Sequence, residues 1–109
     1  MRRKFEILFF EGGKRKPAEK FLLSLSKDTI AKVLRLFDLL EDYGPLIGMP
    51  YVKRVTSQIF ELRIRGKEEV RFLFTTKVKT IIVLHGFKKK RQKIAKREIE
   101  TALKRLTKI

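Results

Sequence analysis

The chain has 109 residues, with 28 Lys and Arg against 12 Asp and Glu, so its formal net charge is +16. This length predicts one domain spanning residues 1–109, and the nine Phe exclude a wholly disordered basic tail. The lack of cysteine excludes disulfides, thiolate metal sites and cysteine catalysis. No apolar run approaches the roughly 18 residues that cross a membrane, and the basic residues 1–5 lack the apolar stretch of a secretory signal. We therefore expect a cytoplasmic protein with no membrane partner.

The positive charge is concentrated near the C-terminal end of the chain. Residues 77–109 hold twelve basic and two acidic side chains, and no acid interrupts the segment from Lys88 to Arg97. Cations at this density repel one another, so an anionic partner would relieve the repulsion. The alternative is a solvated Lys-rich surface of the kind seen in thermophiles. Because Glu is not enriched in step with Lys, the pattern favours a polyanion such as a nucleic acid.

The N-terminal half predicts one strand and two helices. Residues 5–10 are rich in β-prone residues and are followed by two glycines that break the strand. Residues 17–25 begin with proline and continue with apolar side chains at helical spacing, which predicts a first helix. Ser26 can cap a second helix, whose apolar positions recur every three or four residues up to Gly44. We expect the two helices to form a hairpin, followed by a loop over residues 44–57.

In the C-terminal half apolar side chains recur at every second position, which predicts strands. Residues 60–65 and 70–74 alternate between apolar and polar side chains around a short turn, so they predict a β-hairpin. A third strand is predicted over residues 80–87 and a closing helix over residues 95–107. The expected fold is an α+β domain of order β-α-α-β-β-β-α. In it, an N-terminal helical hairpin and a C-terminal helix pack on a small antiparallel sheet.

Two arginines are expected to be neighbours on the polar face of this sheet. Alternation places Arg63 and Arg71 on the same face, within about 8 Å of each other. Two guanidinium groups at that distance are unfavourable unless an anion lies between them. Glu61 could supply that anion within a surface network, or a bound phosphate could supply it, and the sequence leaves both interpretations open. His85 ends the third strand, and Lys53 approaches from the preceding loop.

These residue types suit metal-free cleavage of RNA. One histidine and scattered acids provide no metal-binding pattern, and no glycine-rich phosphate loop is present, so we expect no metal and no cofactor. In such a reaction the 2′-hydroxyl attacks the neighbouring phosphorus, one group removes its proton and another protonates the departing 5′-oxygen. Fixed guanidinium groups would stabilise the extra negative charge of the transition state. Histidine, or a lysine with a lowered pKa, could transfer the protons.

The segments 60–63, 70–74 and 82–90 resemble, in this order, motifs of the RelE/ParE toxin superfamily, and most closely of its HigB-like branch with phage-derived members. Residues 97–102 resemble the closing helix of that branch. The resemblance implies a RelE-like fold and the toxin of a type II toxin–antitoxin system. It further implies a ribosome-dependent, metal-free endoribonuclease, or mRNA interferase. The implied partners are a helix-turn-helix, HigA-like antitoxin, the ribosome and mRNA.

The resemblance also implies roles for particular residues. Arg63 and Arg71 match phosphate-contacting arginines, Lys53 matches a loop lysine, and His85 matches an active-site histidine that acts as acid or base. The tyrosine that some relatives carry near the C-terminus has no counterpart here, so proton transfer falls on His85 or a lysine. The residues expected to bind RNA or the ribosome are Arg54, Arg65, Lys88, Lys89, Lys90, Arg91 and Lys93.

Two alternatives remain open from the sequence. The first is a ParE-like inhibitor of DNA gyrase, because the same fold serves both activities in the superfamily that this chain resembles. The second is a non-catalytic module that binds RNA or the ribosome with strong salt dependence. The arginine pair and His85 favour cleavage of RNA over both.

Overall fold

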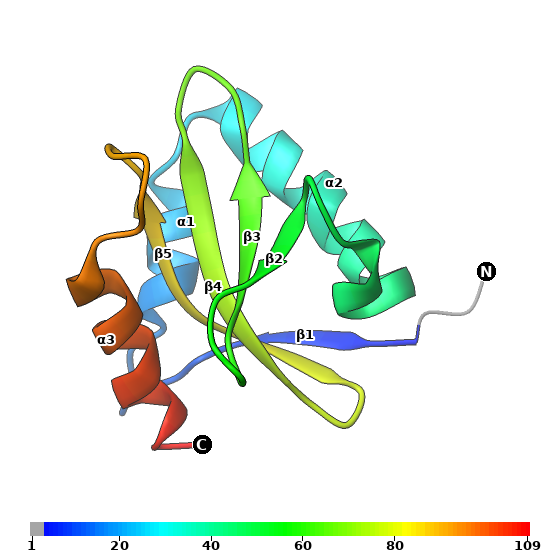
Figure 1. Ribbon diagram of the computed structural model, residues 1–109, viewed down its shortest axis with the longest axis vertical. Coiled ribbons are helices and arrows are strands. Elements are labelled where there is room, and N and C mark those ends of the chain that lie inside the picture. Colours follow the sequence, from blue (N-terminus) through cyan, green and yellow to red (C-terminus); the bar gives the residue numbers. More distant parts are fainter. Residues whose placement is uncertain (1–3) are drawn as a thin grey trace.

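The computed structural model describes residues 4–109, so residues 1–3 of the basic start of the chain lie outside it (Figure 1). The elements are β1 (Glu6–Phe9), α1 (Pro17–Leu23), α2 (Lys27–Tyr43), a 3₁₀ helix (Gly44–Ile47), β2 (Val52–Arg54), β3 (Phe60–Ile64), β4 (Val70–Lys77), β5 (Thr80–Lys88) and α3 (Lys96–Leu106). The predicted α+β class is confirmed. None of the helices in this described part is long and apolar enough to cross a membrane.

The strands form one five-stranded sheet in the order β1-β5-β4-β3-β2. Pairing is antiparallel from β2 through β5, whereas β1 runs parallel to β5 at the edge. The expected four-stranded antiparallel sheet is therefore a mixed sheet of five strands. Side chains alternate with the same period in parallel and antiparallel strands, so the direction of β1 was not readable from its sequence. The three-residue β2, which lies in the predicted loop, is too short to show a period.

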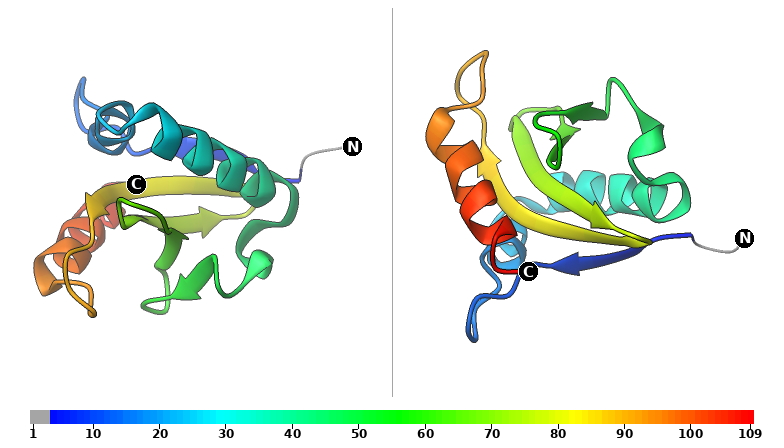
Figure 2. Two further views of the ribbon diagram at one scale, coloured as in Figure 1. Left: turned by 90° about the horizontal axis from the view of Figure 1, so that it is seen from above. Right: turned by 60° about the horizontal axis from the view of Figure 1, so that its bottom comes forward.

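The helices cover opposite faces of the sheet, with α1 and α2 on one side and α3 on the other (Figure 2). The second helix begins where Ser26 Oγ accepts a hydrogen bond of 3.2 Å from the Thr29 amide. It ends at Gly44, whose φ of 62° suits glycine. The helices α1 and α2 follow one another in the chain, and each packs on the sheet rather than along the other helix (Figure 2). The expected helical hairpin is therefore not a closely packed pair.

Two apolar clusters hold the layers together. The larger one joins the even-numbered side chains of β3 and β4, such as Leu62 and Phe72, to α1 and α2. The smaller one lies under α3 and comprises Phe10, Ile59, Leu73, Leu84, Phe87 and Ala102. Gly86 allows the close approach of α1 to β5, because a Cβ there would lie 2.5 Å from the Phe21 ring. Alternation therefore directs the odd-numbered polar residues of β3 and β4 to the same sheet face as α3.

Candidate functional site

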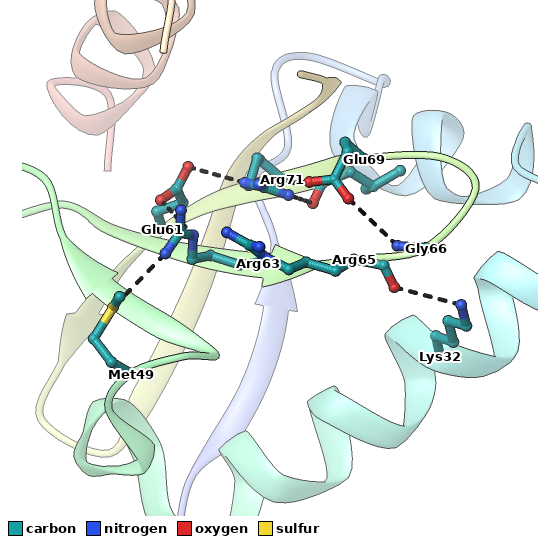
Figure 3. Close-up of polar contacts among 9 residues, drawn as sticks. Lys32, Met49, Glu61, Arg63, Arg65, Gly66, Glu69 and Arg71 are labelled. Carbon is teal, nitrogen blue, oxygen red and sulfur yellow. Dashed lines mark hydrogen bonds and ion pairs between the residues drawn. The ribbon is translucent and has the colours of Figure 1, made fainter. Parts of the chain in front are cut away.

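The two arginines of the hairpin lie directly opposite each other, with one buried carboxylate between them. Arg63 of β3 pairs in register with Arg71 of β4, as predicted. The two oxygens of Glu61 are divided between them: Oε1 lies 3.5 Å from Arg63 Nε and Oε2 lies 3.3 Å from Arg71 Nε (Figure 3). Glu61 is 2% exposed and Arg71 is 1% exposed. The anion that separates the guanidinium groups is therefore Glu61.

Each of the three nitrogens of Arg71 faces an acceptor of the chain itself. Besides the Glu61 contact, its Nη2 donates to Glu69 Oε1 at 3.0 Å and its Nη1 donates to the Val70 carbonyl at 2.9 Å. The hydrogen bond from Arg71 lowers the pKa of the Glu69 carboxyl below its ordinary value, against the opposing effect of burial. Glu69 also accepts a bond of 3.4 Å from the Gly66 amide, which ties the β3–β4 turn to this arginine (Figure 3).

Arg63 is the member of the pair that reaches the surface. Its side chain is 13% exposed, and its Nη1 lies 3.9 Å from Met49 Sδ, a weak acceptor. Arg63 also borders a cleft of about 310 Å³ between α2 and the edge of β3. The other residues lining this cleft are Lys32, Arg35, Leu36, Leu39, Pro50, Tyr51, Ile64 and Arg65. The lining of the cleft thus combines apolar side chains with four cations and contains no acidic side chain.

Two lysines lie beside the arginine pair. Lys53 of β2 is exposed and stands opposite Glu61 in the sheet register. Lys89 follows β5 and is partly buried, and its amide donates to the Glu69 carbonyl at 2.7 Å. Burial lowers the pKa of the Lys89 ammonium, the charge of Arg71 lowers it further, and Glu61 opposes the shift. Lys89 therefore shares the electrostatic environment of the arginine pair, although its sequence indicated only a role in RNA binding.

His85 lies on the same sheet face but is held by α3. Its Nε2 is 2.8 Å from Glu98 Oε1, and its Nδ1 is 3.4 Å from Arg105 Nη1. Because the guanidinium can only donate, Nδ1 accepts and Nε2 carries the proton. Burial lowers the pKa of His85, and Arg105 adds to this shift while Glu98 opposes it. The imidazole is therefore neutral near pH 7, with both ring nitrogens engaged.

Arg105 links His85 to an irregularity in the sheet. A β-bulge between β4 and β5 leaves Leu84 without a direct partner, and Arg105 Nη1 donates to the Leu84 carbonyl at 2.7 Å. The same guanidinium lies 5.7 Å from the centroid of the Phe10 ring. Glu98 and Arg105 are seven residues apart, two helical turns, and share a face with buried Ala102. That spacing is the signal in the sequence for the partners of His85.

The predicted RNA-binding residues fall into separate groups. A hollow of about 160 Å³ after β5 is lined by Phe87, Lys88, Lys89, Lys90, Arg91, Lys93, Ala95, Arg97 and Glu98. Lys88 Nζ also lies 3.5 Å from the Glu68 carboxylate. Arg65 is exposed at the cleft beside Arg63. Arg54 lies apart from the arginine pair, because it stacks over the Phe60 ring at 4.8 Å and donates to the Ser57 carbonyl at 2.7 Å.

The sequence did not indicate Glu69 as a partner of Arg71, because Glu69 lies in the β3–β4 turn, where no alternation of apolar and polar residues marks the direction of a side chain. Within residues 4–109, the structure contains no group of three or more His, Cys, Asp or Glu side chains able to hold a metal ion.

Comparison with known proteins places the chain in a family. Residues 20–107 match the family described as "Phage derived protein Gp49-like (DUF891)". The chain belongs to this Gp49-like family. It is also 35% identical over 75 residues to HigB3 of Mycobacterium tuberculosis, which is named as a candidate toxin. That match covers 64% of this chain and 66% of HigB3, just under two thirds of the relative's length.

A solved structure shares the fold of this Gp49-like protein. A chain in the crystal structure of the archaeal RelE–RelB complex from Pyrococcus horikoshii superposes with a TM-score of 0.55. The sequence identity is 24%, and the match covers 81% of this chain and 98% of that chain. The expected RelE-like fold is therefore confirmed.

Proposed function

We propose that this Gp49-like protein is the toxin of a type II toxin–antitoxin system and acts as a ribosome-dependent, metal-free endoribonuclease on mRNA. The observation that carries the proposal is the cross-strand arginine pair, with the Nη end of Arg63 at the surface and Lys53 and Lys89 beside it. The similarity to a candidate toxin and the RelE-like fold support the same interpretation.

In this proposal the sheet face stabilises the charge that builds up as the RNA is cut. Attack of the 2′-hydroxyl on the adjacent phosphorus adds negative charge to the phosphate oxygens. Arg63 donates hydrogen bonds to those oxygens, while Arg71 adds fixed positive charge behind it. Lys53, which is exposed on the neighbouring strand, contributes a further cation. Because these groups are fixed by the sheet, they need little reorganisation during the reaction.

We assign one proton transfer to His85 and consider Lys89 the second candidate. His85 has both ring nitrogens occupied by Glu98 and Arg105, so proton transfer requires the RNA to replace one of these contacts. Lys89 has a lowered pKa and shares the environment of the arginines, which suits a group that exchanges protons. The variants His85→Gln and Lys89→Met, each measured for single-turnover cleavage over a pH series, separate the two assignments. The residue responsible is the one whose variant loses a limb of the pH profile.

Binding to the ribosome and message is assigned to the basic side chains around the hollow after β5 and to Arg65. The hollow is lined by six cations and one acid, Glu98, which itself contacts His85. Such a surface attracts phosphates without reading sequence, and its affinity falls with salt.

The proposed partner is a HigA-like, helix-turn-helix antitoxin. Leu46 and Met49, which precede the cleft residues Pro50 and Tyr51 in the chain, are 91% and 60% exposed, and exposed apolar groups near a concave surface are typical of a protein interface. The four cations of the cleft would attract acidic residues of the partner. Leu46→Asp should weaken capture of the co-expressed antitoxin, whereas Leu23→Asp, at the end of α1 and 69% exposed in the parent, should not. Equal capture by both variants would argue against this surface.

The cleavage assignment is tested by primer extension on translated and untranslated copies of one mRNA. The purified chain should cut only the translated copy, and Arg63→Ala should not cut. The control Arg15→Ala should cut normally, because Arg15 is exposed before α1 and lines neither the cleft nor the hollow after β5. DNA damage without RNA cuts would instead support the gyrase inhibitor. Salt-sensitive RNA binding with no cuts would support the binding module.

A further inference from the structure

We infer that Glu61 and Arg71 are positioning residues that act through Arg63, and that Arg63 alone of the arginine pair touches the RNA phosphate. The contact with RNA rests on the proposed function. The arrangement of the three side chains is independent of the proposed function, because these contacts form within the protein without any RNA (Figure 3). The resemblance implies phosphate contact for both arginines, whereas here Arg63 makes the contact and Arg71 positions it.

Arg71 offers no exposed donor to a ligand, because its side chain is buried. Its three nitrogens face Glu61, Glu69 and the Val70 carbonyl, at 3.3, 3.0 and 2.9 Å. The side chain is 1% exposed, so a phosphate could reach it only by displacing one of the groups that cover it. Direct contact between Arg71 and the substrate would thus bring two anions, the phosphate and Glu61, into competition for one guanidinium.

Glu61 connects the buried Arg71 to the partly exposed Arg63. One oxygen faces the Nε of Arg71 and the other faces the Nε of Arg63, so the carboxylate engages the same edge of each guanidinium. With its Nε edge turned inward, Arg63 presents its Nη end to the surface, where Met49 Sδ at 3.9 Å is its neighbour. A thioether is a weak acceptor that a phosphate oxygen can readily replace.

The contacts around Glu61 depend on charge more than on hydrogen-bond direction. Glu61 Oε2 and both Nε atoms are buried and make ion pairs without well-aligned hydrogen bonds. An amide in place of the carboxylate would keep the shape of the side chain but remove the attraction. Without that attraction, two guanidinium groups in direct register would repel, and the more exposed Arg63 would move away. The variant Glu61→Gln therefore tests positioning with little change in packing.

The positioning is measured first without RNA, by ¹⁵N NMR of the arginine side chains. The Nε–H of Arg63 should exchange with solvent more slowly than that of Arg97, which is 84% exposed. In Glu61→Gln the Arg63 exchange rate should rise toward that of Arg97, while the backbone spectrum stays folded. Exchange at Arg63 as fast as at Arg97 in the wild-type chain, or unchanged by Glu61→Gln, would overturn the inference.

The contact with RNA is measured next, with an oligonucleotide that carries a 2′-O-methyl group and cannot be cut. Dissociation constants are compared for the wild type, Arg63→Ala, Arg71→Lys and the double variant, with circular dichroism confirming that each is folded. If Arg71 acts through Arg63, the double variant should bind as weakly as Arg63→Ala and no weaker. If the two effects multiply, Arg71 touches the RNA itself and the inference is wrong.

Glu61→Gln provides the same comparison if Arg71→Lys does not fold. Its loss of affinity should vanish in the Arg63→Ala background, and a loss that persists there would contradict positioning through Arg63. A wild-type chain that neither binds nor cuts RNA would refute the proposed function instead. The NMR result would then decide by itself whether Glu61 holds Arg63.

Discussion

Replacing Arg71 with Ala should destabilise the fold itself. The substitution removes a guanidinium that is 1% exposed and leaves the Glu61 carboxylate, 2% exposed, with only the 3.5 Å contact to Arg63. Removal of one partner from a buried ion pair costs about 3–5 kcal/mol, because an uncompensated charge stays in the interior. Glu69 adds little to this cost, since its side chain is 41% exposed and water can replace Arg71 there. Domains are typically stable by about 5–15 kcal/mol, so the loss is a large fraction.

Urea unfolding followed by far-ultraviolet circular dichroism measures this loss. For a slope of about 1–3 kcal/mol per molar urea, a loss of 3–5 kcal/mol lowers the midpoint by about 2 M. The control Arg97→Ala removes an exposed guanidinium and should change stability by no more than about 0.5 kcal/mol. A midpoint for Arg71→Ala close to that of the control would refute the reasoning, because the buried charges would then not depend on each other. If the shift is found, loss of activity in Arg71→Ala says nothing about catalysis, and Arg63→Ala is the informative variant.

Three further predictions concern α3 and the basic hollow. His85 has a lowered pKa in the fold, so the unfolded chain binds a proton at this residue more readily. Wild-type stability should therefore fall relative to His85→Asn as pH drops below about 6.5. A difference between the two urea midpoints that is the same at about pH 7.5 and about pH 5.5 would contradict this. Arg105→Ala leaves the Leu84 carbonyl unpaired and should cost about 1–3 kcal/mol in urea unfolding, against no change for Lys104→Ala, whose side chain is exposed. Replacing Lys90 and Arg91 with Ala should reduce the slope of log affinity against log salt by about 0.7 for each phosphate that these side chains neutralise, and an unchanged slope would exclude them from RNA binding.

The sequence was sufficient for the part of the fold that depends on local periodicity. Alternation in β3 and β4 predicted that Arg63 and Arg71 share a face, and the structure pairs them directly. Ser26 was recognised as the cap of α2 from its position before an apolar repeat. The strand direction of β1 and the existence of β2 were not predicted, because both depend on pairing between segments distant in the sequence.

The candidate site was predictable in its residue types but not in their burial. Glu61 was recognised as a possible partner of both arginines, yet nothing in the alternation shows that Arg71 becomes inaccessible while Arg63 does not. That difference arises because the β3–β4 turn folds Glu69 back onto Arg71, whereas Arg63 lies just beyond the residues of β3 that pair with β2. Likewise, His85 was predicted to end a strand, whereas β5 continues to Lys88 and α3 supplies partners for both ring nitrogens.

The most direct test of the central claim is the chemistry of the RNA ends produced on a programmed ribosome. A translating ribosome stalled on a defined mRNA is mixed with the purified chain in the presence of its usual ions, and the products are analysed by mass spectrometry. Attack by the 2′-hydroxyl predicts an upstream fragment ending in a 2′,3′-cyclic or 3′-phosphate and a downstream fragment with a 5′-hydroxyl, with neither formed by Arg63→Ala. Intact mRNA, fragments with a 5′-phosphate, or equal cleavage by Arg63→Ala would contradict the account.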